Sequence, residues 1–363
     1  MSAVSGRRSQ RLSEPILRAL FVLGSVAFGI PLILAALGFD AGPAMIALWR
    51  GSFGSYDAIT SGTLVRATPV MLTGLSVAIA FRAGVFNIGA EGQFLAGAAA
   101  ATSLSMLPVL RASYPSSPVA LVAGAIAGGA WAAIAALLRA RFRVLEVIST
   151  ILLNFIALYL VGYLVRGPLQ EPLHIYPQSK TIAVAARLSR LLPSSRLHAG
   201  FLIAVAAALA AWWILKFTAA GFRLRAVGAN ADASRSAGMI DVSRTTTRPF
   251  VVSGALAGLA GAIELTGVTF ALYENISPGY GYTGIAVALL ARLDPLGVVA
   301  SSLVFGGLEA GATAMQRDAG VPSVVVSVIE AIIVLGLIVA WPQARRMSIR
   351  RGQQLPTSEP AET

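Results

Sequence analysis

The chain has 363 residues, of which 56% are hydrophobic and only 12% are charged, and its net charge is +12. Soluble domains carry roughly 25% charged residues, and apolar runs long enough to cross a bilayer recur along this chain, so we expect a polytopic membrane protein. The absence of cysteine excludes disulfides and thiolate metal sites. The basic residues lie in short connections between apolar runs, which is typical of membrane topology determinants and argues against a nucleic-acid partner.

The apolar runs predict an all-α helical bundle with about ten transmembrane segments, including short or broken ones. A basic tail, residues 1–18, precedes a first segment that is too long for a signal-peptide core and is expected to be retained. The third and eighth segments are short, and predict either half-helices or untilted spans. The ten segments are 19–37, 65–81, 94–107, 119–138, 147–165, 201–217, 250–272, 282–291, 296–314 and 324–341, within a membrane domain of residues 19–342.

The basic residues also predict the orientation. With ten crossings and a cytoplasmic N-terminus, the arginine-rich loops at 139–143 and 344–346 both fall in the cytoplasm, as the positive-inside rule requires. The C-terminal tail, 343–363, is then cytoplasmic too. Residues 167–199 become an outer loop with a short amphipathic helix near 182–192.

Two glycine-rich segments interrupt the apolar pattern. Residues 84–93 read Gly-Val-Phe-Asn-Ile-Gly-Ala-Glu-Gly-Gln, and residues 279–284 form the second interruption. Hydrocarbon cannot hydrogen-bond the backbone, so irregular polar chain at this depth must be covered by protein or line a water-filled path. Such broken segments often border the route of a transported solute. The aromatic residues beside them can either stack on a planar ring or pack as ordinary apolar side chains: Phe86, Tyr273, Tyr280 and Tyr282.

Carboxylates in or beside the apolar runs are a second set of candidates, because a charge at that depth is costly. Glu91 and Glu146 stand at expected helix starts, where the helix dipole favours an anion without any transport role. The roles of Glu264, Glu309 and Glu330 stay open, and a proton-coupled carrier would explain them.

Catalytic patterns are absent from the sequence. His174 and His198 are the two histidines, and a metal site between them is not favoured. The nearest approach to a phosphate-binding loop, at Lys180, lacks the glycine before the lysine. We therefore expect no catalytic residues, no metal and no cofactor bound by this chain, so any ATP must be hydrolysed by another chain.

The largest cytoplasmic loop, residues 219–248, contains a run of small residues. Asn230 or Asp232 can cap a short helix that contains Ala233 and ends near Gly238. Small side chains let another surface approach closely, although a solvated connector is the alternative. Small residues also fill 123–130 and 254–261, where they predict close packing between helices.

Five segments together resemble one known family, and they occur in that family's order: 84–93, 146–156, 228–238, 253–261 and 284–297. The chain is similar to the membrane-spanning permease subunit of bacterial ATP-binding-cassette (ABC) importers, in the branch that carries simple sugars and nucleosides. The Asn-Ile-Gly-Ala-Glu-Gly-Gln form of residues 87–93 resembles the nucleoside type.

The resemblance implies a transport subunit of the bacterial inner membrane, and no enzyme. Its expected partners are an ABC ATPase that binds ATP and magnesium, a second permease that is a paralogue or an identical copy, and a substrate-binding lipoprotein or periplasmic protein that delivers a nucleoside. The motif matches imply a substrate pathway along Phe86, Asn87, Glu91, Gln93, Asn154 and Tyr282. They also imply a coupling helix for the ATPase at Gly228, Asn230, Ala233, Ala237 and Gly238.

Three alternatives remain at this point. One is an ABC permease for a simple sugar, and another is a secondary carrier driven by protons. The third is a membrane scaffold or enzyme without a transport role, which the absence of a nucleophile–base cluster and the two polar interruptions argue against.

Overall fold

The fold is known from a computed structural model, which describes residues 29–109, 116–238 and 240–322 and, beyond these, residues 324, 325, 327, 328 and 331. This part of the chain contains no β-strand, only three isolated β-bridges. Its helices are α2 (Ile30–Ala36), α3 (Ala41–Ser52), η2 (Ala58–Thr63), α4 (Leu64–Arg82), α5 (Ala90–Ser105), α7 (Ser117–Phe142), α8 (Glu146–Arg166), η3 (Val184–Ala186), α9 (Gly200–Phe217), α10 (Ala219–Ala229), α11 (Ala231–Ser236), α12 (Val242–Glu264), η4 (Leu265–Thr269), α13 (Tyr280–Leu290) and α14 (Pro295–Ala319).

Six helices in the described residues are long and apolar enough to cross a membrane: Ala58–Arg82, Ser117–Phe142, Glu146–Arg166, Gly200–Phe217, Val242–Thr269 and Pro295–Ala319. They match six of the expected segments, and α5 and α13 match the two short ones. The expected segments 19–37 and 324–341 lie largely outside the described residues, as do both tails. The short helix α3 was not expected from the sequence.

Two compact units make up the chain. The larger is Trp49–Gly311, which contains most of the helices. The smaller combines the two ends of the chain, Met1–Leu48 and Ala312–Thr363, and only part of it is described. The site residues described below all belong to the larger unit. Of the candidate residues from the sequence, Glu330 falls outside the described residues.

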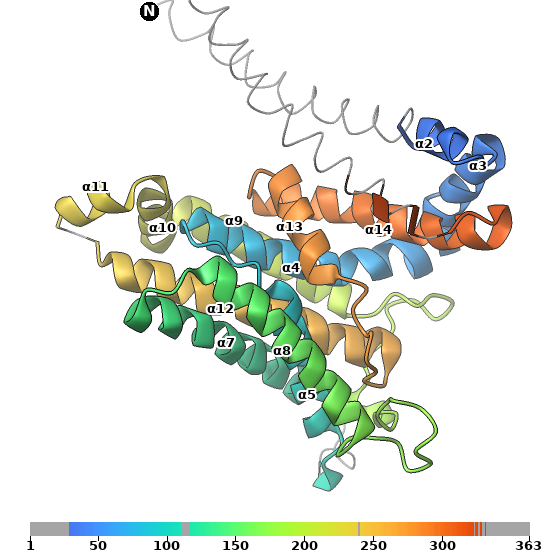
Figure 1. The fold of residues 1–363 in the computed structure, drawn as a ribbon, viewed down its shortest axis with the longest axis horizontal. Coiled ribbons are helices and arrows are strands. Elements are labelled where there is room, and N and C mark those ends of the chain that lie inside the picture. Colours follow the sequence, from blue (N-terminus) through green and yellow to red (C-terminus); the bar gives the residue numbers. More distant parts are fainter. Residues whose placement is uncertain are drawn as a thin grey trace, which may run out of the picture. The chain divides into compact units, whose positions relative to one another are not determined.

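Helix α12 packs against α4, α5 and α7 to form the core of the larger unit (Figure 1). Glycine makes this close approach possible. A methyl group built on Gly128 of α7 would lie 2.6 Å from the Cα atom of Gly258 in α12, and one built on Gly254 would lie 2.5 Å from the Gly128 carbonyl oxygen. The predicted close packing of segments 123–130 and 254–261 is therefore confirmed, and it leaves no room there for a side chain.

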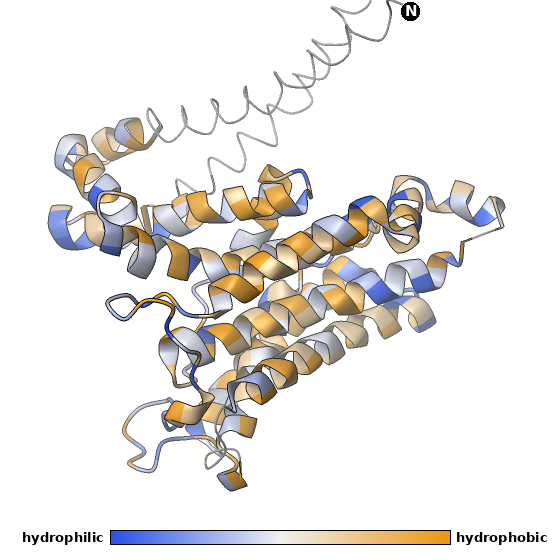
Figure 2. Cartoon of the chain, turned by 180° about the vertical axis from the view of Figure 1, so that it is seen from behind, coloured by the Kyte–Doolittle hydropathy of each residue, from blue (hydrophilic) through white to orange (hydrophobic). Residues whose placement is uncertain are grey.

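The helices of the larger unit end in two groups of connections. At one end, which we call the loop end, residues 167–199 contact the ends of the neighbouring helices: the Ser116 amide donates to Ala185, and the Ser179 amide to Leu272. At the other, the α11 end, Gly84 lies against Gly228. Hydrophilic residues concentrate at helix ends and in connections, while apolar residues cover the long helices (Figure 2).

The amphipathic helix expected near residues 182–192 is absent, and that prediction was wrong. The described chain there forms only the short 3₁₀ turn η3. Its backbone is instead paired with a distant segment, because the Ile182 amide donates to the Phe270 carbonyl at 2.8 Å and the Leu188 amide to Thr266 at 2.9 Å. These long-range bonds replace the local ones that a helix needs.

Candidate functional site

The first interruption contains a non-helical connection, residues 83–89, which joins α4 to α5. The buried side-chain amides of Asn87 and Gln93 hold it in place. Asn87 is fully buried, and its Nδ2 donates to the side-chain oxygens of Gln93 at 2.9 Å and Ser253 at 2.7 Å. Its Oδ1 accepts from Gln93 Nε2 at 3.0 Å and from the Gly89 amide at 2.9 Å. Ser253 lies on α12, so these bonds fasten the interruption to the core. Asn87 and Gln93 thus have protein partners for most of their polar atoms.

The short helices α5 and α13 begin face to face inside the bundle. Thr73, in the middle of α4, donates to the carbonyl of Tyr280 at 2.8 Å, so α13 begins at that depth. Glu91 lies in the first turn of α5, and its Oε2 accepts from the Gly281 amide at 2.7 Å. The Glu91 carboxylate therefore caps the N-terminus of α13, where a helix dipole favours an anion.

Asn154 connects α8 to the same region. Its Oδ1 accepts from the Gly92 amide at 2.8 Å, and its Nδ2 donates to the Ile88 carbonyl at 2.9 Å. The Tyr282 hydroxyl lies 3.4 Å from the same Nδ2. One buried amide thus satisfies backbone groups that the helical ladder leaves unpaired at the start of α5.

The other two predicted pathway residues lie at the surface of the unit. Phe86 is 53% exposed and Tyr282 is 48% exposed. Phe86 contacts Phe81 edge to face, with 5.1 Å between ring centroids. The six predicted residues therefore lie together, with four of them enclosed among helices and the two aromatic ones outside.

A polar cavity of about 350 Å³ lies at the loop end, among the first turns of α4, the end of α12 and the start of α13. We call it the loop-end cavity; it is lined by Ser61, Val65, Arg66, Arg196, Glu264, Val268, Thr269, Tyr273 and Tyr280. Two π-helical turns, η2 and η4, contribute to its wall. π-Helical turns inside longer helices are frequent at functional sites.

Glu264 differs from the four enclosed pathway residues because it lacks a protein partner. Its side chain lies in the cavity wall and the residue is only 5% exposed, yet within the described residues no hydrogen bond or ion pair reaches its carboxylate. The positive charges of Arg196 and Arg66 act on it from nearby. Burial, and then the charge of Glu264, raise the pKa of Tyr273, so its hydroxyl remains a hydrogen-bond donor.

Residues of the 167–199 loop are fixed over the cavity. The Arg196 amide donates to Ser61 Oγ at 3.1 Å, and Ser195 Oγ lies 3.3 Å from the same hydroxyl. His198 is buried beside Gly200 and Gly267, and neither of its ring nitrogens has a partner in the described structure. Burial, and then the nearby Arg196 charge, lower the pKa of His198 to about 4.

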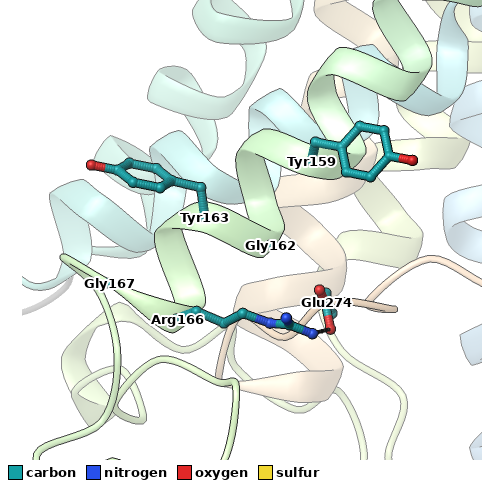
Figure 3. Close-up of a pocket in the computed structure, with 6 residues that line it drawn as sticks. All are labelled: Tyr159, Gly162, Tyr163, Arg166, Gly167 and Glu274. Carbon is teal, nitrogen blue, oxygen red and sulfur yellow. Dashed lines mark hydrogen bonds and ion pairs between the residues drawn. The ribbon is translucent and has the colours of Figure 1, made fainter.

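A second, shallower pocket lies along α8 near its C-terminal end. Figure 3 shows Arg166 and Glu274 joined across it, with an N–O distance of 2.9 Å, while Tyr159 and Tyr163 point away from the pair. The two charges neutralise each other, and none of the predicted site residues lines this pocket. It joins α8 to the segment before α13, which is a structural role.

The predicted coupling loop forms two short helices, α10 and α11. Asn230 caps α11 by accepting from the Ala233 amide at 2.9 Å, and Gly238 follows the helix with φ +71°, as the local sequence predicts. The predicted coupling residues are all exposed: Gly228, Asn230, Ala233, Ala237 and Gly238. Gly228 also packs on the carbonyl of Arg82, at the end of α4.

Sequence reasoning named Tyr273 and Tyr280 but missed the two arginines that line the cavity with Glu264. Arg66 and Arg196 are 130 positions apart and belong to a helix and a loop, so no local pattern connects them. The sequence did signal Glu264 itself, as a carboxylate inside an apolar run. Within the described residues, no group of three histidine, aspartate or glutamate side chains is arranged to hold a metal ion.

Comparison with known proteins identifies the family. Residues 59–341 match the family described as branched-chain amino acid transport system / permease component. The chain belongs to this permease family. The permease is therefore a multi-pass membrane protein and a transport subunit. No solved structure matches it significantly.

Three of the similar proteins match almost the whole permease. The guanosine ABC transporter permease protein NupP of Bacillus subtilis is 39% identical over 90% of this chain and 93% of its own length. The glucose ABC transporter permease protein TsgB13 of Haloferax volcanii is 38% identical, over 93% and 91%. The nucleoside ABC transporter permease protein NupB of Lactococcus lactis is 34% identical, over 89% and 92%.

Proposed function

We propose that this permease forms the translocation path of an ATP-driven importer for a nucleoside, which an external binding protein delivers. The observation that carries the proposal is the similarity to guanosine and nucleoside permeases over about nine tenths of the chain. The partner chains are an ABC ATPase, which binds ATP and magnesium, a second permease subunit and the binding lipoprotein or periplasmic protein. The assembly lies in the bacterial inner membrane, with ten crossings and both termini of this chain in the cytoplasm.

Within this assembly the solute passes Phe86 and Tyr282, the two predicted pathway residues that are exposed. Asn87, Glu91, Gln93 and Asn154 hold the first interruption and the start of α13 behind them. The two interruptions thus provide a rigid wall beside the path, and their polar groups have hydrogen-bond partners within the protein. This arrangement resembles broken transporter helices, whose irregular backbone is tolerated where protein covers it.

The ATPase docks on α11 and the neighbouring part of α10. The exposed small residues there leave room for a partner groove, and the contact between Gly228 and the end of α4 connects the docking surface to the first interruption. Movement of α10 and α11 during the ATP cycle would therefore reach the residues beside the path directly.

Deletion of the gene tests this function. Uptake of radiolabelled guanosine by the deletion strain is expected to fall to background and to return when the gene is restored. Ala233→Trp should block ATPase co-purification and uptake while leaving membrane insertion intact. Glu171→Gln, on the outer loop, is the control for expression. Guanosine uptake unchanged by the deletion would contradict the proposal.

A simple sugar is the second candidate substrate, because the glucose permease TsgB13 is almost as similar as the guanosine permease. Radiolabelled glucose in the same two strains decides between them. A loss of glucose uptake with unchanged guanosine uptake would favour the sugar.

A further inference from the structure

We infer that the loop-end cavity is a nucleoside-binding subsite in which Glu264 accepts hydrogen bonds from two neighbouring donor groups of the ligand. The inference rests on the proposed function, and goes beyond it by assigning a site and the ligand groups that it recognises. None of the six residues that the sequence motifs predicted for the path lines this cavity.

The unpaired carboxylate is the main reason. A buried carboxylate without a hydrogen bond is costly, and most buried polar groups in proteins have a partner. Every other enclosed polar residue of the predicted pathway has one: Asn87, Glu91, Gln93 and Asn154. Glu264 instead lies in the wall of an open cavity, so a ligand that enters the cavity can supply the missing donors.

The lining suits a neutral ring compound with hydrogen-bonding edges. A volume of about 350 Å³ lies within the range of small-molecule sites. Tyr273 offers a partly exposed ring for stacking, and Tyr280 adds a second aromatic wall. Arg66 and Arg196 also line the cavity, and arginine is a residue type that donates hydrogen bonds to the acceptors of guanine.

Two parts of a nucleoside carry paired donors that match a carboxylate. One is the ribose 2′,3′-diol, and the other is the guanine edge with its N1–H and exocyclic N2–H groups. Both place two donors side by side, so both satisfy the same carboxylate oxygens. The experiment below distinguishes them through the choice of analogue.

The position of the cavity fits an entry site. It lies at the loop end, which the orientation of the chain predicts to be external, and Arg196 reaches it from the outer loop. A solute released by an external binding protein would meet this cavity before it reaches Phe86 and Tyr282. Glu264 would then hold the nucleoside only during transfer.

The test uses the native strain with Glu264→Gln introduced on the chromosome. Uptake of radiolabelled guanosine is measured at a limiting concentration, and unlabelled guanosine, 2′,3′-dideoxyguanosine and adenosine are added as competitors. The matched control is Glu274→Gln, which makes the same change at the same end of the bundle, outside the cavity. Because hydrogen bonds to charged groups are the stronger ones, we expect Glu264→Gln to lower guanosine uptake about tenfold or more and Glu274→Gln to leave it near wild type.

The competitors identify the group that Glu264 binds. If it binds the diol, wild type discriminates against dideoxyguanosine and the variant loses that discrimination. If it binds the guanine edge, the variant loses discrimination against adenosine. Changes in these ratios between variant and wild type exclude the binding protein as their source, because that protein is identical in both strains.

Three results would overturn the inference: wild-type guanosine uptake in Glu264→Gln, the same relative competition by dideoxyguanosine and adenosine in variant and wild type, or uptake that follows an imposed pH gradient and stops in the variant. If Glu264→Gln fails to insert into the membrane, substitutions of Tyr273 test the site instead. Tyr273→Leu should lower guanosine uptake several-fold, whereas Tyr273→Phe, which keeps the ring, should not. Equal effects of the two substitutions would contradict the site. Failure of the proposed function looks different, because deletion of the gene would then leave guanosine uptake unchanged.

Discussion

Glu91 and Glu264 are both buried glutamates in membrane helices, and the structure treats them in opposite ways. Glu91 caps the N-terminus of α13, with an oxygen 2.7 Å from the Gly281 amide. Glu264 lines a polar cavity and has no hydrogen-bond partner among the described residues. The comparison teaches that a carboxylate inside an apolar run is not by itself a transport residue. Its available partners decide whether it stabilises the fold or remains free to bind a solute.

Removal of the amide network around Asn87, which holds the first interruption, should give the largest change in stability. Asn87→Leu leaves the Gln93 side chain and the Gly89 amide without a partner at full burial, while Ser253 keeps its bond to Ser76, so we expect a loss of about 3 kcal/mol in the free energy of unfolding. Reversible denaturation of the purified chain in detergent measures it. Phe86→Leu, one position earlier and exposed, should change stability little. Equal losses in both variants would show that the network is not what holds this region.

His198 brings a pH dependence to the loop end. Its pKa is about 4 in the folded chain and about 6.5 when unfolded, so the unfolded state binds more protons between these values and stability falls as the pH drops through this range. The full loss is about 3 kcal/mol at 1.36 kcal/mol per pKa unit. His198→Leu should flatten the profile between pH 4 and 6.5, whereas the matched control His174→Leu, at an exposed histidine, should not. A profile unchanged in His198→Leu would contradict this assignment.

Glu91 gives a smaller effect that depends on the substitution. Glu91→Ala removes the acceptor for the Gly281 amide and should cost about 1–2 kcal/mol in the free energy of unfolding, whereas Glu91→Gln retains an acceptor oxygen and should cost less. The same denaturation experiment compares the two variants. If the glutamine variant were as unstable as the alanine variant, the charge rather than the hydrogen bond would be the stabilising element.

Glu264 should show the reverse of Glu91, with the smallest change in stability. Glu264→Gln replaces a buried carboxyl group without a hydrogen-bond partner by an amide of nearly the same shape, so the free energy of unfolding should stay the same or rise by less than about 1 kcal/mol. Thermal unfolding of the purified variant measures this change. A clear loss of stability would mean that Glu264 has a structural partner, and the contrast with Glu91 would disappear.

The local parts of the structure could be predicted from the sequence. Apolar length located the long helices, and an asparagine followed by small residues predicted the cap at Asn230. The contacts between distant segments could not be predicted. Asn87 and Ser253 are 166 residues apart, and Glu264 and Arg196 line one cavity only because the loop of residues 167–199 folds back over η2. The incorrect prediction of a helix at 182–192 has the same cause, because the backbone of these residues pairs with the segment after α12, which is distant in the sequence.

Reconstitution of the complete transporter in liposomes tests the central claim most directly. The permease is purified with its partner subunits, the binding protein and radiolabelled guanosine are supplied outside, and uptake is measured with ATP inside, with a non-hydrolysable ATP analogue, or with a pH gradient alone. The account predicts guanosine accumulation only with ATP and the binding protein. Accumulation driven by the pH gradient without ATP would contradict it.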